Sequence, residues 1–256
     1  MRSFFLLFFL FGSLFAKPVV LVSVAPQKFL VESIAPDLCT IEVLVPAGAS
    51  PHSYEPKISQ IHAIKDAAIW FRIGESFEEK LLPLVAVIVD QRDGLELIGC
   101  RCHGGADPHI WLSPKMLRQE ARQICSALEK ILEMNLQDNL TALIQKIDYL
   151  EQKLLLQKFP NEILVSHPAF GYFCRDFKIE QLSVEMDGQE PSVRQLTRLM
   201  DEVKRRGIKR IYLQEQYSKK GGQQIARQLG LEMLDVDPYE ENVLANLERM
   251  GEVFCD

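Results

Sequence analysis

One stretch decides the fold, Pro114–Pro160: PKMLRQEARQICSALEKILEMNLQDNLTALIQKIDYLEQKLLLQKFP. It has no glycine or proline between its two end residues, and it is rich in Leu, Gln, Glu and Lys, which are typical of helix. One apolar stripe at helical spacing consists of Leu117, Ala121, Ile124, Leu128 and Leu132. After a break at 133–138, a second helix over 137–158 would span about 33 Å. We expect this second helix to be a rigid spine between two lobes.

Strands and helices alternate on both sides of this helical region. The expected strands are 17–24, 39–46, 67–74, 85–91, 95–99, 161–167, 179–185, 208–214 and 231–237, and the expected helices between them are 27–35, 58–64, 77–84, 169–177, 192–207 and 218–230. This order predicts an α/β fold with mostly parallel sheets. We therefore expect an N-terminal lobe (17–136), the spine helix (137–158) and a C-terminal lobe (159–256).

The first residues, MRSFFLLFFLFGSLFAKP, indicate export. Arg2 precedes an apolar run, Phe4–Phe15, that is shorter than a membrane span, and the small residue Ala16 follows it. We expect residues 1–16 to be a cleavable signal peptide, which makes the mature protein periplasmic. Six cysteines in an exported chain permit disulfides, but their pairing is not readable from the sequence.

The net charge of −6 argues against a nucleic-acid binder and favours cations over anions as ligands. Three histidines lie in similar loops, each beside a proline and after an expected strand or loop: His52 in PHSYEP, His109 in DPHIWLSP and His167 in VSHPAFGYF. Three imidazoles and one carboxylate suit zinc and its neighbours in the transition series. In the second half, Asp237 of LDVDP is the expected fourth ligand, and Asp235 competes with it.

PHSYEP, DPHIWLSP, SHPAFGYF and LDVDP, in this order and joined by a long helix, resemble the metal-specific solute-binding proteins of bacterial ABC importers, the zinc/manganese-uptake family. The resemblance covers roughly Lys17 to Val253. It implies two α/β lobes on a spine helix with the metal in the cleft between them, and the ligands His52, His109, His167 and Asp237. It also implies a monomer that delivers its ion to a permease with an ATPase partner. Because manganese members usually carry glutamate at the position of His167, zinc is favoured over manganese or iron.

The chain departs from the family pattern in three places. The loop before the second ligand is short, CRCHGGAD, so that a metal-scavenging loop is doubtful and Cys100, Cys102 and His103 offer at most a weak secondary site. Gln214 stands where the family tends to have glutamate. Pro51 stands where some zinc members have an acidic residue.

The sequence leaves two alternatives to metal uptake, a zinc carboxypeptidase and an exported adhesin. His52-Ser53-Tyr54-Glu55 is an HxxE pattern with His167 further along, as in zinc carboxypeptidases, but no second glutamate has a clear general-base context. An exported adhesin is the other alternative.

Metal-bound histidines usually donate their second ring N–H to a partner, which orients the imidazole. Glu55, Trp111 and Tyr172 lie beside the candidate ligands in the sequence, and we expect one of them to be such a partner.

Overall fold

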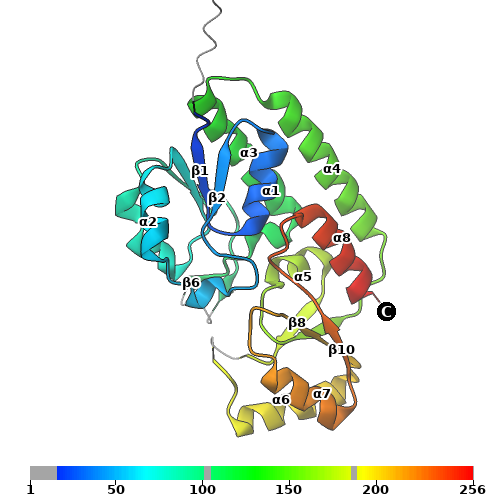
Figure 1. Cartoon of the computed structure of the whole chain (residues 1–256). Coiled ribbons are helices and arrows are strands. Elements are labelled where there is room, and N and C mark those ends of the chain that lie inside the picture. Colours follow the sequence, from blue (N-terminus) through cyan, green and yellow to red (C-terminus); the bar gives the residue numbers. More distant parts are fainter. Residues whose placement is uncertain (1–15, 101–104, 186–188, 256) are drawn as a thin grey trace, which may run out of the picture.

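The computed structural model describes residues 16–100, 105–185 and 189–255 of the 256-residue chain. The predicted signal peptide lies outside the described residues except for Ala16. Within the described ranges, no helix combines the length and the apolar character that crossing a membrane requires. The described part forms two α/β lobes, each around a parallel sheet (Figure 1), which confirms the predicted fold class.

The first lobe contains a four-stranded parallel sheet in the order β2-β1-β3-β4. Helices α1 and α3 pack on one face of this sheet, and α2 with two 3-10 turns packs on the other. The elements are β1 (Val19–Val22), α1 (Ala25–Ile34), β2 (Thr40–Val43), η1 (Pro51–Ser53), α2 (Ile58–Lys65), β3 (Ile69–Arg72), η2 (Ser76–Lys80), η3 (Leu82–Leu84), β4 (Ile88–Asp90), β5 (Gly99–Cys100), β6 (Gly105–Ala106), η5 (Ile110–Leu112) and α3 (Pro114–Leu132).

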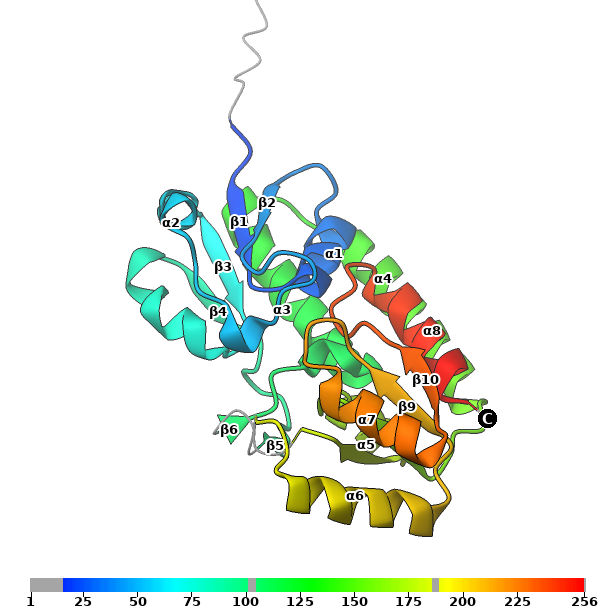
Figure 2. The ribbon, with the colours of Figure 1, turned by 60° about the horizontal axis from the view of Figure 1, so that its bottom comes forward.

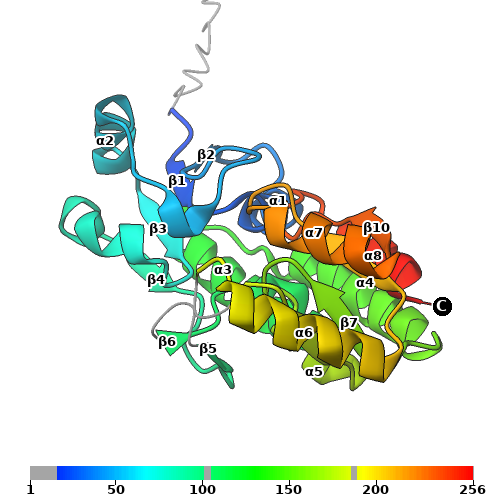
Figure 3. The same ribbon diagram turned by 90° about the horizontal axis from the view of Figure 1, so that it is seen from below.

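The second lobe repeats this design with the strand order β10-β9-β7-β8. Helices α6 and α7 lie side by side on one face, as Figure 3 shows, and α5 and α8 pack on the other. The elements are β7 (Glu162–Val165), α5 (Gly171–Phe177), β8 (Glu180–Ser183), α6 (Val193–Arg206), β9 (Arg210–Leu213), α7 (Lys220–Leu229), β10 (Glu232–Asp235) and α8 (Val243–Phe254).

Helix α4 (Gln137–Leu155) runs along both lobes and packs against α1 and α3 of the first lobe and α8 of the second (Figures 1 and 2). Its buried stripe is Leu140, Leu143, Ile147, Leu150 and Leu154. These side chains belong to one hydrophobic core that continues into both lobes. Because this core is shared, separating the lobes would expose apolar surface.

Three expected elements differ from the observed ones. Residues 77–84 form two short 3-10 turns instead of one helix. Pro83 cannot donate a helical hydrogen bond, and the turns fold around the buried Glu78. The carboxylate of Glu78 accepts hydrogen bonds from the backbone N–H groups of Ile73 and Gly74. The expected strand 95–99 is reduced to β5, which pairs antiparallel with β6. Helix α4 ends at Leu155 rather than at 158. The last turn is tightened there, because the N–H groups of Leu156 and Gln157 each donate to the carbonyl three residues earlier.

Candidate metal centre

Three histidines that are far apart in the sequence meet between the lobes. His52 lies in η1 after β2, His109 immediately precedes η5, and His167 follows β7. Each offers a ring nitrogen, and these ligand atoms all lie within 4.8 Å of one another. The Nε2 atoms of His52 and His167 are 3.1 Å apart. A tetrahedral zinc ion with Zn–N bonds of about 2.0–2.1 Å holds two nitrogens roughly 3.3 Å apart, so this spacing suits a metal.

The sheet topology explains why these loops converge. In the second lobe the chain runs from β7 outward to β8 and then crosses back to β9, which places a switch point between β7 and β9. Open α/β sheets bind ligands at the carboxyl ends of the strands beside such a point. His167 follows β7 there, and in the first lobe His52 follows the carboxyl end of β2.

Each histidine has a carboxylate at its Nδ1 atom. The pairs are His52 with Glu75 at 2.9 Å, His109 with Asp107 at 2.7 Å and His167 with Glu185 at 2.8 Å. A carboxylate at this position accepts the Nδ1 proton and selects the tautomer whose Nε2 carries a lone pair. All three imidazoles are therefore prepared to coordinate through Nε2.

Burial keeps His167 in the neutral form that metals require. His109 and His167 are fully buried, and the side chain of His52 is 19% exposed. Burial, together with the neighbouring His109 and His52, lowers the pKa of His167 to about 4, although the hydrogen bond to Glu185 acts in the opposite direction. His167 is therefore neutral at pH 7 and needs to lose no proton before it binds a cation.

Two tyrosines close the remaining side of the cluster. Tyr217 Oη lies 2.9 Å from His52 Nε2, Tyr239 Oη lies 2.9 Å from His109 Nε2, and the two hydroxyl oxygens are 2.6 Å apart. The ring of Tyr217 stacks on His167 at 3.6 Å with an interplanar angle of 7°. Burial raises the pKa of both phenols well above its ordinary value, so both hydroxyls keep their protons.

The closest contact between two imidazoles shows what this cluster can hold. The Nε2 atoms of His52 and His167 are 3.1 Å apart. When the Nδ1 proton of each ring goes to its carboxylate, both Nε2 atoms carry lone pairs, and these lone pairs face each other. A cation accepts such lone pairs, so the arrangement is suited to a divalent transition metal.

Three of the four predicted ligands are thus brought together, and the fourth, Asp237, accepts other hydrogen bonds. Among the described residues, Asp237 is not part of the histidine group. Its Oδ1 accepts from Gln216 Nε2 and from the backbone N–H of Tyr239, both at 2.8 Å. The competing candidate, Asp235, has an exposed side chain that pairs with Lys219 at 2.6 Å.

The residues expected to orient an imidazole have other partners. Glu55 pairs with Lys80 at the surface, the indole of Trp111 donates to the carbonyl of Pro238, and the hydroxyl of Tyr172 donates to the carbonyl of Asp107. The HxxE pattern therefore does not place its glutamate on His52, which pairs with Glu75 instead.

The departures noted in the sequence have structural counterparts. Gln214 is buried, accepts from the backbone N–H of His167 at 3.0 Å and donates to its carbonyl at 2.6 Å, so it fixes this ligand loop. Cys102, His103 and the side chain of Cys100 lie outside the described part. Of the other cysteines, Cys39, Cys125 and Cys174 are free thiols.

Five further residues at the site were not predicted from the sequence: Glu75, Asp107, Glu185, Tyr217 and Tyr239. Four of them follow the carboxyl ends of parallel strands: Glu75 after β3, Glu185 after β8, Tyr217 after β9 and Tyr239 after β10. The rule that located the histidines would therefore have located these residues, had it been applied to every polar side chain after a strand. Asp107 stands inside the DPH motif itself.

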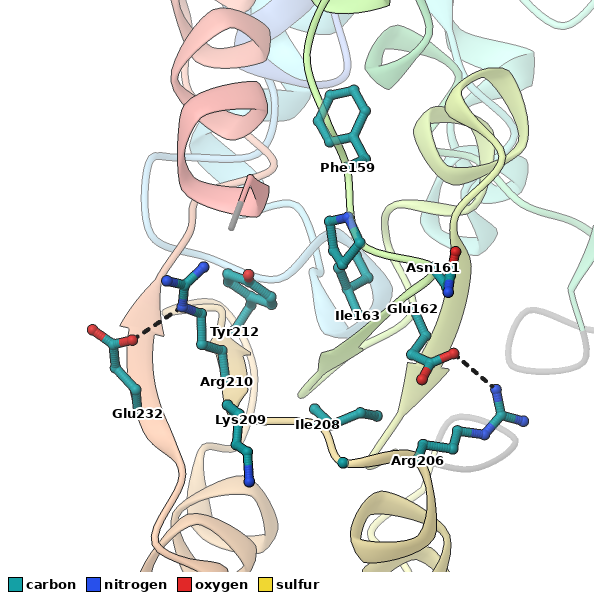
Figure 4. A pocket seen from close by; sticks show the side chains of 12 residues that line it. Phe159, Asn161, Glu162, Ile163, Arg206, Ile208, Lys209, Arg210, Tyr212 and Glu232 are labelled. Carbon is teal, nitrogen blue, oxygen red and sulfur yellow. Dashed lines mark hydrogen bonds and ion pairs between the residues drawn. The ribbon is translucent and has the colours of Figure 1, made fainter.

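A larger cavity, of about 540 Å³, opens at the opposite ends of the strands of the second lobe (Figure 4). Ion pairs already engage charged residues of its lining, Arg206 with Glu162 and Arg210 with Glu232. A cavity of about 340 Å³ borders His52, Glu185 and Tyr217 instead. The smaller cavity therefore lies beside the histidine cluster.

Comparison with known proteins relates this arrangement to zinc uptake. The family model described as ZnuA, zinc-uptake complex component A periplasmic, matches residues 20–248. A putative metal-binding protein of Chlamydia muridarum (strain MoPn / Nigg) is 32% identical, with 100% of both chains aligned. The high-affinity zinc uptake system protein ZnuA of Bacillus subtilis (strain 168) is 26% identical over 82% of this chain and 75% of its own length. A crystal structure of ZnuA, 32% identical, matches 93% of this chain and 98% of its own with a TM-score of 0.88.

Proposed function

Because the chain belongs to the ZnuA family of periplasmic zinc-uptake components, we propose that it captures zinc and delivers it to an ABC permease with an ATPase partner. The family consists of solute-binding proteins and not of enzymes, so the carboxypeptidase alternative is discarded. The observation that supports zinc capture most directly is the meeting of three imidazoles, each with a carboxylate at Nδ1.

The ligand chemistry favours zinc over manganese and iron within this family. Three neutral nitrogens form a ligand set that zinc accepts readily, whereas manganese prefers carboxylate, carbonyl and water oxygens. His52, His109 and His167 are the proposed ligands. Coordination of zinc by Asp237 stays a prediction, since its Oδ1 is engaged by Gln216 and Tyr239.

The experiment that tests this function is metal analysis of protein purified without chelator, followed by competition among Zn²⁺, Mn²⁺ and Fe²⁺ on the metal-free protein. We expect one zinc per chain and a preference for zinc. A site that prefers manganese or iron would assign the protein to uptake of that metal, and a chain that binds no metal would refute the proposal.

The arrangement of the mature protein follows from the same proposal. We propose that residues 1–16 are removed on export to the periplasm, and that 17–136 and 159–256 are two lobes on the spine region 137–158. The hydrophobic core that α4 shares with both lobes favours small lobe and loop shifts over wide opening during release. The exported protein acts as a monomer in this scheme.

Asp107 is expected to strengthen zinc binding although it does not face the metal position. Its carboxylate accepts the Nδ1 proton of His109 at 2.7 Å and also the backbone N–H of the same residue at 2.9 Å. Asp107→Asn removes the charge behind the ligand, so we expect zinc affinity to fall about 10- to 100-fold. Competition with a chromophoric chelator measures this, and Asp201→Asn on the exposed side of α6 is the matched control. Equal affinities of the two variants would contradict the contribution of the Asp107 charge.

Zinc affinity is expected to fall when the pH is lowered from 7.5 to 5, because protons compete with the metal for imidazole lone pairs. His167 contributes little to this fall, since burial lowers its pKa to about 4, below the tested range. Titration at several pH values measures the effect. An affinity that does not change over this range would contradict binding by imidazole.

A further inference from the structure

We propose that the hydroxyl pair of Tyr217 and Tyr239, rather than Asp237, forms the fourth face of the cargo site and presents a neutral oxygen to the cation. This inference rests on the proposed function, because it concerns the same site. It changes the ligand set from three imidazoles with a carboxylate to three imidazoles with a phenol oxygen.

The two hydroxyls lie at the ring nitrogens that are proposed to bind the metal. Tyr217 Oη and Tyr239 Oη each lie 2.9 Å from the Nε2 atom of a different histidine, His52 and His109. These are the ring nitrogens that point toward the proposed metal position, because the Nδ1 atoms face carboxylates. The two oxygens therefore border the same small volume as the imidazole lone pairs.

The hydroxyl pair can present an oxygen lone pair without losing a proton. The two hydroxyl oxygens are 2.6 Å apart. When a metal takes the Nε2 lone pairs, one hydroxyl can donate its proton to the other, and the donating oxygen keeps both of its lone pairs. This leaves one neutral oxygen donor for a fourth coordination position.

The tyrosine rings are held firmly on this face. Tyr217 is stacked on His167. The ring of Tyr239 contacts the fully buried Trp111 at a centroid distance of 5.4 Å. The indole N–H of Trp111 also donates to the carbonyl of Pro238 at 2.7 Å, directly before Tyr239 in the chain. This buried hydrogen bond fixes the peptide group that joins Pro238 to Tyr239.

Asp237 serves this arrangement by shaping the loop that carries Tyr239. Its Oδ1 accepts from the backbone N–H of Tyr239, and its own carbonyl accepts from Asn246 Nδ2 at 2.7 Å. Gln216, which donates to the same Oδ1, precedes Tyr217 in the chain. The carboxylate thus connects the two loops that hold the tyrosines, which is a positioning role that a neutral amide oxygen can also fill.

The test compares zinc affinity and the visible absorption of bound Co²⁺ in two variants of the mature protein. The double variant Tyr217→Phe with Tyr239→Phe loses both hydroxyls and keeps both rings, so we expect a tenfold or greater loss of zinc affinity and a changed Co²⁺ spectrum. Asp237→Asn keeps the acceptor and loses the charge, so we expect less than a threefold loss and an unchanged spectrum. Tyr149→Phe, at an exposed position of α4, is the matched control.

The outcomes are distinct. A tenfold or greater loss in Asp237→Asn overturns the proposal and assigns the fourth ligand to that carboxylate, and so does unchanged binding in the double variant. Circular dichroism and thermal unfolding of the metal-free proteins check the fold, and the two single Phe variants replace the double variant if it does not fold. A wild-type chain that binds no zinc would refute the proposed function instead.

Discussion

Replacing His109 by alanine is expected to weaken zinc binding more than about a hundredfold. This exceeds the effect expected for a residue that only hydrogen-bonds to a ligand, such as Asp107. His109 is fully buried, its Nε2 points into the histidine cluster, and its Nδ1 is oriented by Asp107. Alanine removes one of three nitrogen donors and leaves the others unable to complete a four-coordinate site. Competition with a chromophoric chelator of known affinity gives the change in dissociation constant.

The matched control for this variant is His62→Ala, because His62 is an exposed histidine on α2. We expect the control to bind zinc as the wild type does, and both metal-free variants to keep their circular dichroism spectra. Tight stoichiometric zinc in His109→Ala would show that the three-histidine cluster is not the cargo site.

Replacing Glu120 by glutamine is expected to stabilise the metal-free protein, and more so at higher pH. Glu120 is fully buried in α3, and neither oxygen of its carboxylate has a hydrogen-bond partner among the described residues. Burial raises its pKa from 4.5 to about 8. The unfolded chain therefore loses this proton at lower pH than the folded protein does, and the wild type loses stability as the pH rises from 4.5 to 8.

Glutamine has no proton to lose, so its advantage over glutamate follows the same pH range. We expect the free energy of unfolding to increase by on the order of 4 kcal/mol at pH 8, and by about 1 kcal/mol or less at pH 5. Urea unfolding at the two pH values measures this, with the exposed Glu96→Gln as control. A stability difference that does not depend on pH would show that Glu120 titrates normally.

The local pattern of the chain was sufficient for most of the fold. Helical spacing over 114–158 predicted α3 and α4, and alternating strands and helices predicted the two parallel sheets. It failed at 77–84, where the apolar spacing resembles a helix but the chain wraps around the buried Glu78. The local pattern does not reveal that the Glu78 carboxylate will be buried and will accept hydrogen bonds from the backbone of Ile73 and Gly74.

The site shows the same division between local and long-range information. His52, His109 and His167 were located because each stands in a proline-containing loop that follows a strand or another loop, and Asp237 was placed beside them by its similar position after β10. The structure brings Tyr239, two residues further along, to the cluster, whereas coordination by Asp237 stays a prediction. A shift of two residues in a loop is decided by hydrogen bonds such as those of Asp237 to Gln216 and Tyr239, which the sequence does not reveal.

The sequence by itself determined the α/β class, the long helical region between the lobes and three candidate nitrogen ligands, because periodicity and strand-end position are local properties of the chain. Only the tertiary structure decided which side chains face those ligands. His52 lies 165 residues from Tyr217, and His109 lies 130 residues from Tyr239. Such contacts depend on how the two sheets pack across a shared core, and this packing is a property of the whole chain.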